Sequence, residues 1–216
     1  MDKQYVIFDM DGTLVDSMPY WRKLARTYLA KKGLTRGLDE LEDEVRSLTL
    51  SESALFFIRH FDLEVDAEQV ISELNQIMAD HYHQDIPLKP GVLPLLEELK
   101  ARGVRMCVAS ATDLDLMEAC LSRLGILPYF EFLLSCEDMG ISKRDPDIYL
   151  EAALRFSADP SEIAVFEDAW HAALTAKEAG FYLVGVYEEE EKDNWDRILG
   201  LADESVFFDH PDFSEK

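Results

Sequence analysis

Residues 4–17 read QYVIFDMDGTLVDS. The first half of this segment is a short run of β-branched and aromatic residues, which predicts a buried strand over residues 4–9. The strand ends at Asp9, and Gly12 allows a sharp turn whose backbone N–H groups can face a phosphate. The segment therefore places two carboxylates, Asp9 and Asp11, at a turn suited to an anion.

The sequence after Asp16 changes to a helical pattern that continues to about Pro87. Its apolar residues fall into four groups: Leu24, Tyr28 and Leu29; Leu41, Val45 and Leu48; Leu55, Ile58 and Phe61; and Val70, Leu74, Ile77 and Met78. Because no convincing strand interrupts these groups, we expect an inserted α-helical domain over residues 17–88.

Beyond Pro90-Gly91 helices and strands alternate. We expect helices over residues 92–100, 114–124, 146–156 and 172–179, and strands over residues 104–109, 132–134, 163–166 and 182–186. Alternating units of this length predict a parallel sheet with helices on both faces, in a Rossmann-like, doubly wound α/β fold. The insert separates the first strand from the others, so the core domain is discontinuous and comprises residues 1–16 and 89–216.

Ligands of open parallel sheets bind at the carboxyl ends of the strands. Each of the first four expected strands is followed by polar residues that can bind or attack phosphate. They are Asp9, Asp11 and Thr13 after the first strand, Ser110 and Thr112 after the second, Lys143 one loop beyond the third, and Glu167 and Asp168 after the fourth. Their convergence on one edge of the sheet predicts an active site there.

These residue types suit phosphoryl transfer. A carboxylate such as Asp9 can attack phosphorus and form an acyl phosphate that water then cleaves. Asp11 can protonate the leaving group and later activate the water. Two carboxylates about 4 Å apart repel by about 4 kcal/mol at an effective dielectric of 20, so a cluster of four needs a cation. Mg²⁺ prefers a few carboxylates, water and a substrate oxygen, which makes Asp9 and Asp168 suitable ligands.

The net charge narrows the range of partners. The 216 residues carry a formal charge of −23, which argues against binding to nucleic acid or to an anionic membrane surface. An acidic protein with an anionic substrate must gather positive charge locally, from a metal ion, a few basic side chains and helix N-termini. The composition therefore points to a cation cofactor and a small-molecule substrate.

The cysteines and the hydropathy bear on location. Cys107, Cys120 and Cys136 are odd in number and lack metal-ligand spacing, which fits a reducing cytosol. The N-terminal residues lack the layout of a signal peptide, and no apolar run approaches the roughly 18 residues of a membrane span. We expect a cytoplasmic protein that is able to fold as a monomer.

The segment Phe8–Ser17 resembles, in full, the first motif of the haloacid dehalogenase superfamily of phosphotransferases. Ser110 matches the second motif, Lys143 the third and Glu167-Asp168 the fourth. The helical insert is similar to the first class of cap domain in that superfamily. The resemblance covers nearly the whole chain.

The resemblance implies a role for each residue. Asp9 would be the nucleophile and a Mg²⁺ ligand, and Asp11 the acid and base, with its backbone carbonyl on the metal. Thr13, Ser110 and Lys143 would hold the phosphoryl oxygens. Asp168 would bind the metal, and Glu167 would do so directly or through water. Dehalogenases of the superfamily need no metal, but Asp11 and the Glu167-Asp168 pair favour the phosphotransferase branch.

Two departures from the superfamily pattern affect the packing near the site. Arg144 stands where the third motif usually has Pro, and Ala169 and Ala172 stand where the fourth usually has Ser and Gly. No catalytic group is removed, so the activity is still expected, but the position of Trp170 is left open.

The sequence predicts a Mg²⁺-dependent phosphatase for a small phosphomonoester, of the sugar or nucleotide phosphate class. The alternative is a phosphosugar mutase similar to β-phosphoglucomutase. Such a mutase has a His early in the cap, where Trp21 stands here, and residues 47–50 lack the Gly and Arg expected to grip a second sugar phosphate. Both differences favour hydrolysis. A non-catalytic binding protein on this fold is disfavoured because Asp9, Lys143 and Asp168 are all present.

Overall fold

The computed structural model describes residues 1–34, 45, 48 and 50–208. The chain divides into a core unit, Met1–Asp16 with Pro87–Lys216, and a helical unit, Ser17–Ile86. The expected boundary was two residues later, after residue 88. Pro87 and Leu88 belong to the core unit because they pair with its N-terminal segment. Val15 forms an antiparallel bridge with Leu88, and the Asp16 N–H donates to the Pro87 carbonyl at 3.0 Å.

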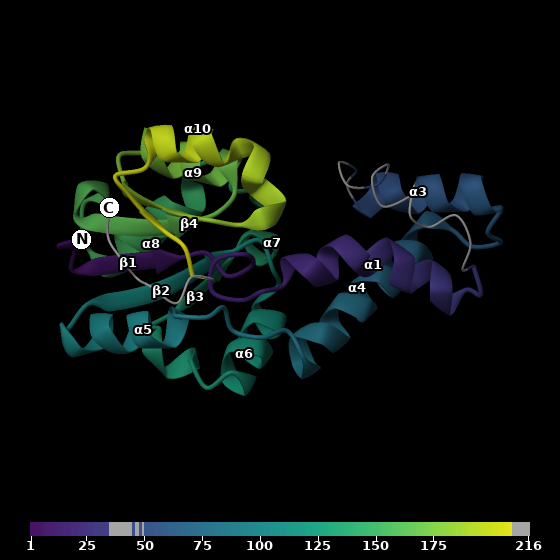
Figure 1. Ribbon diagram of the computed structural model, residues 1–216, viewed down its shortest axis with the longest axis horizontal. Coiled ribbons are helices and arrows are strands. Elements are labelled where there is room, and N and C mark those ends of the chain that lie inside the picture. Colours follow the sequence, from purple (N-terminus) through teal and green to yellow (C-terminus); the bar gives the residue numbers. More distant parts are fainter. Residues whose placement is uncertain (35–44, 46–47, 49, 209–216) are drawn as a thin grey trace. The chain divides into compact units, whose positions relative to one another are not determined.

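Within the described residues the core unit contains a six-stranded parallel sheet (Figure 1). Its strands are β1 (Tyr5–Phe8), β2 (Arg105–Ser110), β3 (Leu133–Ser135), β4 (Ile163–Glu167), β5 (Tyr182–Val186) and β6 (Glu204–Val206). Their order across the sheet is β3-β2-β1-β4-β5-β6, and each neighbouring pair is parallel. The chain moves outward from β1 to one edge and then returns to its other side. The predicted doubly wound α/β fold is therefore confirmed, whereas β6 was not predicted.

The helices of the core unit flank these strands. They are α5 (Val92–Ala101), α6 (Leu114–Arg123), α7 (Cys136–Met139), α8 (Asp147–Phe156), α9 (Trp170–Glu178) and α10 (Trp195–Leu201). In Figure 1 the strands run between α9 and α10 on one side and α5 and α6 on the other. Of these helices, α7 and α10 were not predicted, because neither has a long apolar stripe.

Strand β1 is central because it is apolar on both faces. On one face Ile7 lies in a buried cluster with Cys107 of β2 and Tyr149 of α8. Phe8 is fully buried too, and its ring lies 4.6 Å from that of Phe166 on β4. This packing fixes the end of β1 beside the end of β4.

The described part of the helical unit consists of α1 (Met18–Lys31), α3 (Leu50–Phe61) and α4 (Ala67–Gln84), and α4 packs against both of the others. The rings of Tyr28 and Phe57 stack with centroids 5.8 Å apart. The Trp21 indole N–H donates to the Tyr82 hydroxyl at 3.3 Å, so its polar group is used within this unit. The helix expected around Leu41, and Ser47 and Thr49 of the 47–50 segment, lie outside the described residues.

Across the described ranges, no helix has both the length and the apolar composition needed to cross a membrane.

Candidate active site

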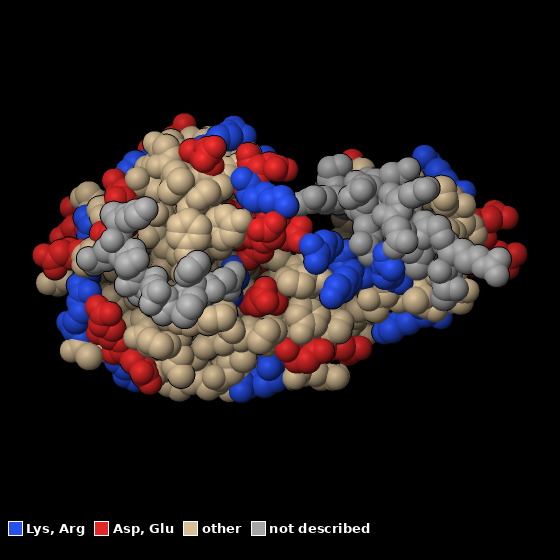
Figure 2. All heavy atoms as spheres, in the orientation of Figure 1, with Lys and Arg blue, Asp and Glu red and all other residues tan. Residues whose placement is uncertain are grey.

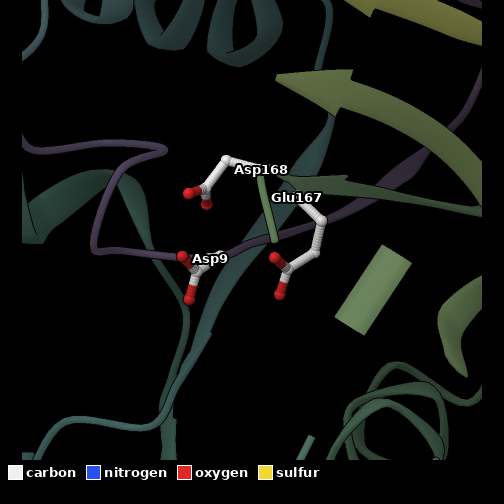
Figure 3. A group of neighbouring side chains, drawn as sticks. All are labelled: Asp9, Glu167 and Asp168. Atoms are coloured by element: carbon white, nitrogen blue, oxygen red, sulfur yellow. The ribbon is translucent and has the colours of Figure 1, made fainter. Parts of the chain in front are cut away.

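The carboxyl ends of β1 and β4 bring three acidic residues together (Figure 3). Asp9 directly follows β1, Glu167 is the last residue of β4, and Asp168 follows it. The two strands are neighbours, with Phe8 in register with Phe166, and the Asp9 N–H donates to the Phe166 carbonyl at 3.0 Å. The parallel pairing therefore extends to the point where the carboxylates begin.

Asp9, Glu167 and Asp168 could together hold a metal ion. Each offers a carboxylate oxygen, these oxygens all lie within 4.8 Å of one another, and all three residues are buried. Hard oxygen donors of this kind are those that Mg²⁺ prefers in proteins. Because the cluster is acidic and shielded from water, a divalent cation fits it both in donor chemistry and in charge.

The electrostatics of the cluster also favour a cation. Burial raises the pKa of Asp9 from 3.8 to about 7, and Lys143 only partly opposes this rise. Burial, followed by the charges of Asp9 and Glu167, holds the pKa of Asp168 well above its ordinary range. Ionised carboxylates are therefore unfavourable here unless a positive charge is added.

Lys143 is the basic residue at the centre of the site. It comes from the loop between α7 and α8, and its ammonium group donates to Asp9 Oδ1 and, at 2.5 Å, to Glu167 Oε1. Burial alone would lower the pKa of Lys143, but the Asp9 and Glu167 carboxylates outweigh it and hold this pKa well above the usual value. Lys143 is therefore charged and links the ends of β1 and β4.

Glu167 is held by several donors. The same Oε1 that contacts Lys143 accepts a 2.9 Å hydrogen bond from the buried Tyr149 hydroxyl, and Oε2 accepts a weak one from the Ala169 N–H at 3.4 Å. Tyr149 was not singled out in the sequence, because its position on α8 is indistinguishable from that of an ordinary core aromatic residue. Its hydrogen bond helps to hold the Glu167 carboxylate against Lys143.

The turn after Asp9 packs tightly on Asp168. Gly12 has φ +81°, and a Cβ added there would lie 2.3 Å from Asp168 Oδ2. The Thr13 hydroxyl donates to Asp168 Oδ1 at 2.9 Å. The Gly12 N–H donates to the Val15 carbonyl at 3.0 Å, so this N–H is used within the turn. Gly12 is thus required by both conformation and space.

Ser110 and Asp11 are linked through Thr112. Ser110, the last residue of β2, is buried, and its Oγ accepts a hydrogen bond from the Thr112 N–H at 3.2 Å. The Thr112 hydroxyl donates to Asp11 Oδ2 at 2.6 Å. The structure therefore brings the ends of β1, β2 and β4 and the Lys143 loop to one region, as the convergence of polar residues in the sequence predicted.

The acidic run at residues 188–191 begins with a buried side chain. Glu188 forms an ion pair with the buried Lys89, with 2.5 Å between Lys89 Nζ and Glu188 Oε2. The other acidic residues of the run lie in a short 3-10 helix, Glu189–Asn194. The local sequence does not reveal the burial of Glu188, because its partner Lys89 is 99 residues away.

Positive charge is thus placed inside the core unit. Acidic side chains are spread over the face of the molecule shown in Figure 2, in keeping with the net charge of −23. By contrast, Lys89 and Lys143 are both buried. The charge of Lys89 lowers the pKa of the Asp168 carboxyl and that of Lys143 lowers the pKa of Asp9, each against the larger effect of burial. An acidic protein therefore has its compensating charge where the carboxylates meet.

The departures from the superfamily motifs have local effects only. Ala169 occupies the N-cap of α9, which has no side-chain cap hydrogen bond, as expected when Ser is absent. Ala172 is fully buried, and Trp170 lies under the Arg197 guanidinium, 3.9 Å from ring centroid to Cζ. The Arg144 carbonyl accepts from the Thr175 hydroxyl at 3.3 Å. None of these contacts displaces a carboxylate of the cluster.

Comparison with known proteins points to one family. The sequence profile of the haloacid dehalogenase-like hydrolases matches residues 3–180. A fructose-1-phosphate phosphatase of Escherichia coli K12 is 30% identical over 193 residues, which cover 84% of this chain and 95% of that protein. Hexitol phosphatase B of the same strain is 28% identical over 174 residues, or 80% of this chain and 78% of the relative.

The fold is shared with solved structures. A candidate β-phosphoglucomutase from Thermotoga maritima superposes with a TM-score of 0.80 at 22% identity and covers 95% of each chain. At this identity the likeness establishes the architecture alone.

Proposed function

The chain belongs to the haloacid dehalogenase-like hydrolase family and is a phosphatase, and we propose that it hydrolyses a phosphorylated carbohydrate through an aspartyl phosphate on Asp9. The observation that carries this proposal is the buried cluster of Asp9, Glu167 and Asp168 with Lys143 between two of its carboxylates. The carbohydrate class rests on the relatives, which are named as phosphatases of hexitol and fructose phosphates.

We propose that Mg²⁺ is the cofactor and that Asp9, Asp168 and the Asp11 carbonyl hold it, with Glu167 acting directly or through water. When bound, Mg²⁺ would offset the charge of the carboxylates and of the phosphoryl oxygens. The donor set supports this assignment because buried carboxylates, with pKa values raised by burial, favour a hard divalent cation.

The side chains of the site suit a two-step reaction. In the first step an Asp9 oxygen attacks phosphorus, the bond from phosphorus to the leaving oxygen breaks, and Asp11 gives that oxygen a proton. In the second step Asp11 takes a proton from water, whose oxygen attacks phosphorus and releases Asp9. Ser110 and Lys143 would bind the phosphoryl oxygens. Thr13 keeps this predicted role too, although its hydroxyl bonds to Asp168 here.

Two further expectations remain proposals. The three cysteines are free and buried, which supports the reducing, cytoplasmic location expected from their number. A monomer is still expected, and size-exclusion chromatography with light scattering would measure the oligomeric state.

The test is a screen of hexose, pentose and polyol phosphates with Mg²⁺, measured by release of inorganic phosphate. We expect release from several of these compounds without a bisphosphate activator, and its loss in Asp9→Asn. If Asp9→Asn keeps more than about a hundredth of the wild-type kcat, another residue is the nucleophile.

The same preparation separates phosphatase from mutase. β-Glucose 1-phosphate is added, and its conversion to glucose 6-phosphate is followed beside phosphate release. Trp21 cannot shuttle a proton as His can, and its N–H is bonded to Tyr82, so hydrolysis should dominate. Isomerisation about ten times faster than hydrolysis would establish the mutase instead.

A further inference from the structure

We propose that Thr112 is a positioning residue that holds the Asp11 carboxyl in place during both steps of the reaction. The inference rests on the proposed function of Asp11 and assigns a task to a residue outside the four motifs. Its basis is the 2.6 Å hydrogen bond from the Thr112 hydroxyl to Asp11 Oδ2, which joins residues 101 positions apart in the sequence.

Thr112 is itself held at a fixed position relative to β2. Its backbone N–H donates to Ser110 Oγ at 3.2 Å, and Ser110 is the last, buried residue of that strand. Because Ser110 Oγ acts as acceptor in this bond, its own hydroxyl hydrogen is left to donate to a phosphoryl oxygen. One residue therefore sets the geometry of two groups that the reaction needs.

Asp11 needs such support because of where it lies. It belongs to the turn after β1, outside the strand, and its side chain is half-buried, whereas Asp9 and Asp168 are buried. A carboxyl in a turn can rotate about its side-chain bonds, and proton transfer requires it within hydrogen-bond reach of the leaving oxygen. The bond from Thr112 to Oδ2 limits this rotation, and in the proposed reaction Oδ1 would carry the transferred proton.

A hydroxyl is suited to both protonation states of Asp11. It can donate to the carboxylate that remains after Asp11 has protonated the leaving oxygen. It can also donate to the carbonyl oxygen of the carboxylic acid before that transfer, when the acid proton is on the other oxygen. A lysine ammonium would favour the carboxylate over the acid form through its charge, whereas the neutral hydroxyl does not. Thr112 keeps its hydrogen bond while the proton leaves Asp11 in the first step and returns from water in the second.

The test compares Thr112→Val with Thr112→Ser on two generic substrates, phenyl phosphate and 4-nitrophenyl phosphate. Phenolate is the poorer leaving group, so its departure depends more on protonation by Asp11. Val removes only the hydroxyl and keeps the N–H that bonds to Ser110. We expect Thr112→Val to lower kcat/KM for phenyl phosphate about tenfold more than for 4-nitrophenyl phosphate. Thr112→Ser should behave like the wild type.

Two controls complete the design. Thr27→Val removes a hydroxyl that donates only to the Lys23 carbonyl within α1, and it should leave the ratio of the two rate constants unchanged. In an Asp11→Asn background, Thr112→Val should cause no further selective loss, because the acid that it positions is absent. The ratio is independent of the fraction of enzyme that is folded, so a less stable variant still gives a result.

Equal loss on both substrates in Thr112→Val, or no loss, would overturn the inference while phosphate release by the wild type upholds the proposed function. A Thr112→Ser variant as selective in its loss as Thr112→Val would overturn it too, since the hydroxyl would then be irrelevant. Absence of phosphate release from the wild type would instead reject the proposed function itself.

Discussion

Replacing Asp9 by Asn should stabilise the metal-free protein, although it abolishes turnover. Asp9 is buried, and burial raises the pKa of its carboxyl from 3.8 to about 7 despite the contact with Lys143. The folded state therefore binds the Asp9 proton more tightly than the unfolded state does. The resulting stability is fully present below about pH 4 and is lost as the pH rises through about 7.

The size of the effect follows from the same values. A pKa change from 3.8 to about 7 corresponds to about 4 kcal/mol at a pH above 7. Asp168 lies in the same cluster and can take up the proton in place of Asp9, so we expect about half of this amount, or about 2 kcal/mol, in Asp9→Asn. The amide of Asn does not ionise. The gain in the free energy of unfolding of Asp9→Asn over the wild type should therefore be small near pH 4 and reach its full value above pH 7.

The measurement is urea unfolding of both proteins in excess chelator between pH 5 and pH 8. Asp2→Asn, at an exposed position, controls for the change in net charge. Adding Mg²⁺ should stabilise the wild type more than the variant, because a ligand that binds only the folded state adds more stability the more tightly it binds. An Asp9→Asn variant less stable than the wild type at pH 8, or an advantage independent of pH, would refute the reasoning.

Three other perturbations test the site and its surroundings. Gly12→Ala places a Cβ 2.3 Å from Asp168 Oδ2 at φ +81°, so unfolding in urea should show a loss of about 1–3 kcal/mol and Mg²⁺ titration a weaker affinity. Unchanged Mg²⁺ affinity would show that Asp168 moves freely. Glu188→Ala leaves the buried Lys89 without its carboxylate and should lower the free energy of unfolding by about 3–5 kcal/mol, whereas the double change Lys89→Met/Glu188→Leu should lower it less. Equal losses would contradict the cost assigned to an uncompensated buried charge. Excess chelator should abolish phosphate release and Ca²⁺ should restore it poorly, because Ca²⁺ takes more oxygen ligands at longer distances; full turnover in chelator would exclude a metal role for Asp168.

The carboxylate cluster can be predicted from the sequence, but the contacts that its residues make cannot. The apolar run before Asp9 and the one before Glu167 predict buried parallel strands, and parallel strands bring their carboxyl ends to one edge. This reasoning predicts that Asp9 and Asp168 lie at the same edge of the sheet, without any knowledge of the strand order. It does not reveal that β1 and β4 are immediate neighbours, since this depends on how the intervening chain packs.

The features that escaped prediction have two physical causes. Strand β6 reads Glu-Ser-Val over Glu204–Val206, and at the sheet edge it has too little apolar character to be recognised. The Lys89–Glu188 and Thr112–Asp11 contacts join residues that are 99 and 101 positions apart. Charge patterns in a sequence describe the average exposed residue, so a buried pair of this separation leaves no local signal.

The central place of β1 has a consequence for biosynthesis. Its two partners begin at Arg105 and Ile163, so a growing chain must add the whole helical unit before β1 can pair on even one side. Until then Tyr5–Phe8, which is almost wholly buried in the finished protein, has two unpaired backbone edges and exposed apolar side chains. The helical unit relies on contacts among nearby helices and can form early, whereas the core unit must wait for distant segments. We expect Asp9 to lie beside Glu167 and Asp168 only after most of the chain has left the ribosome, so a truncated nascent chain would have the nucleophile without its site.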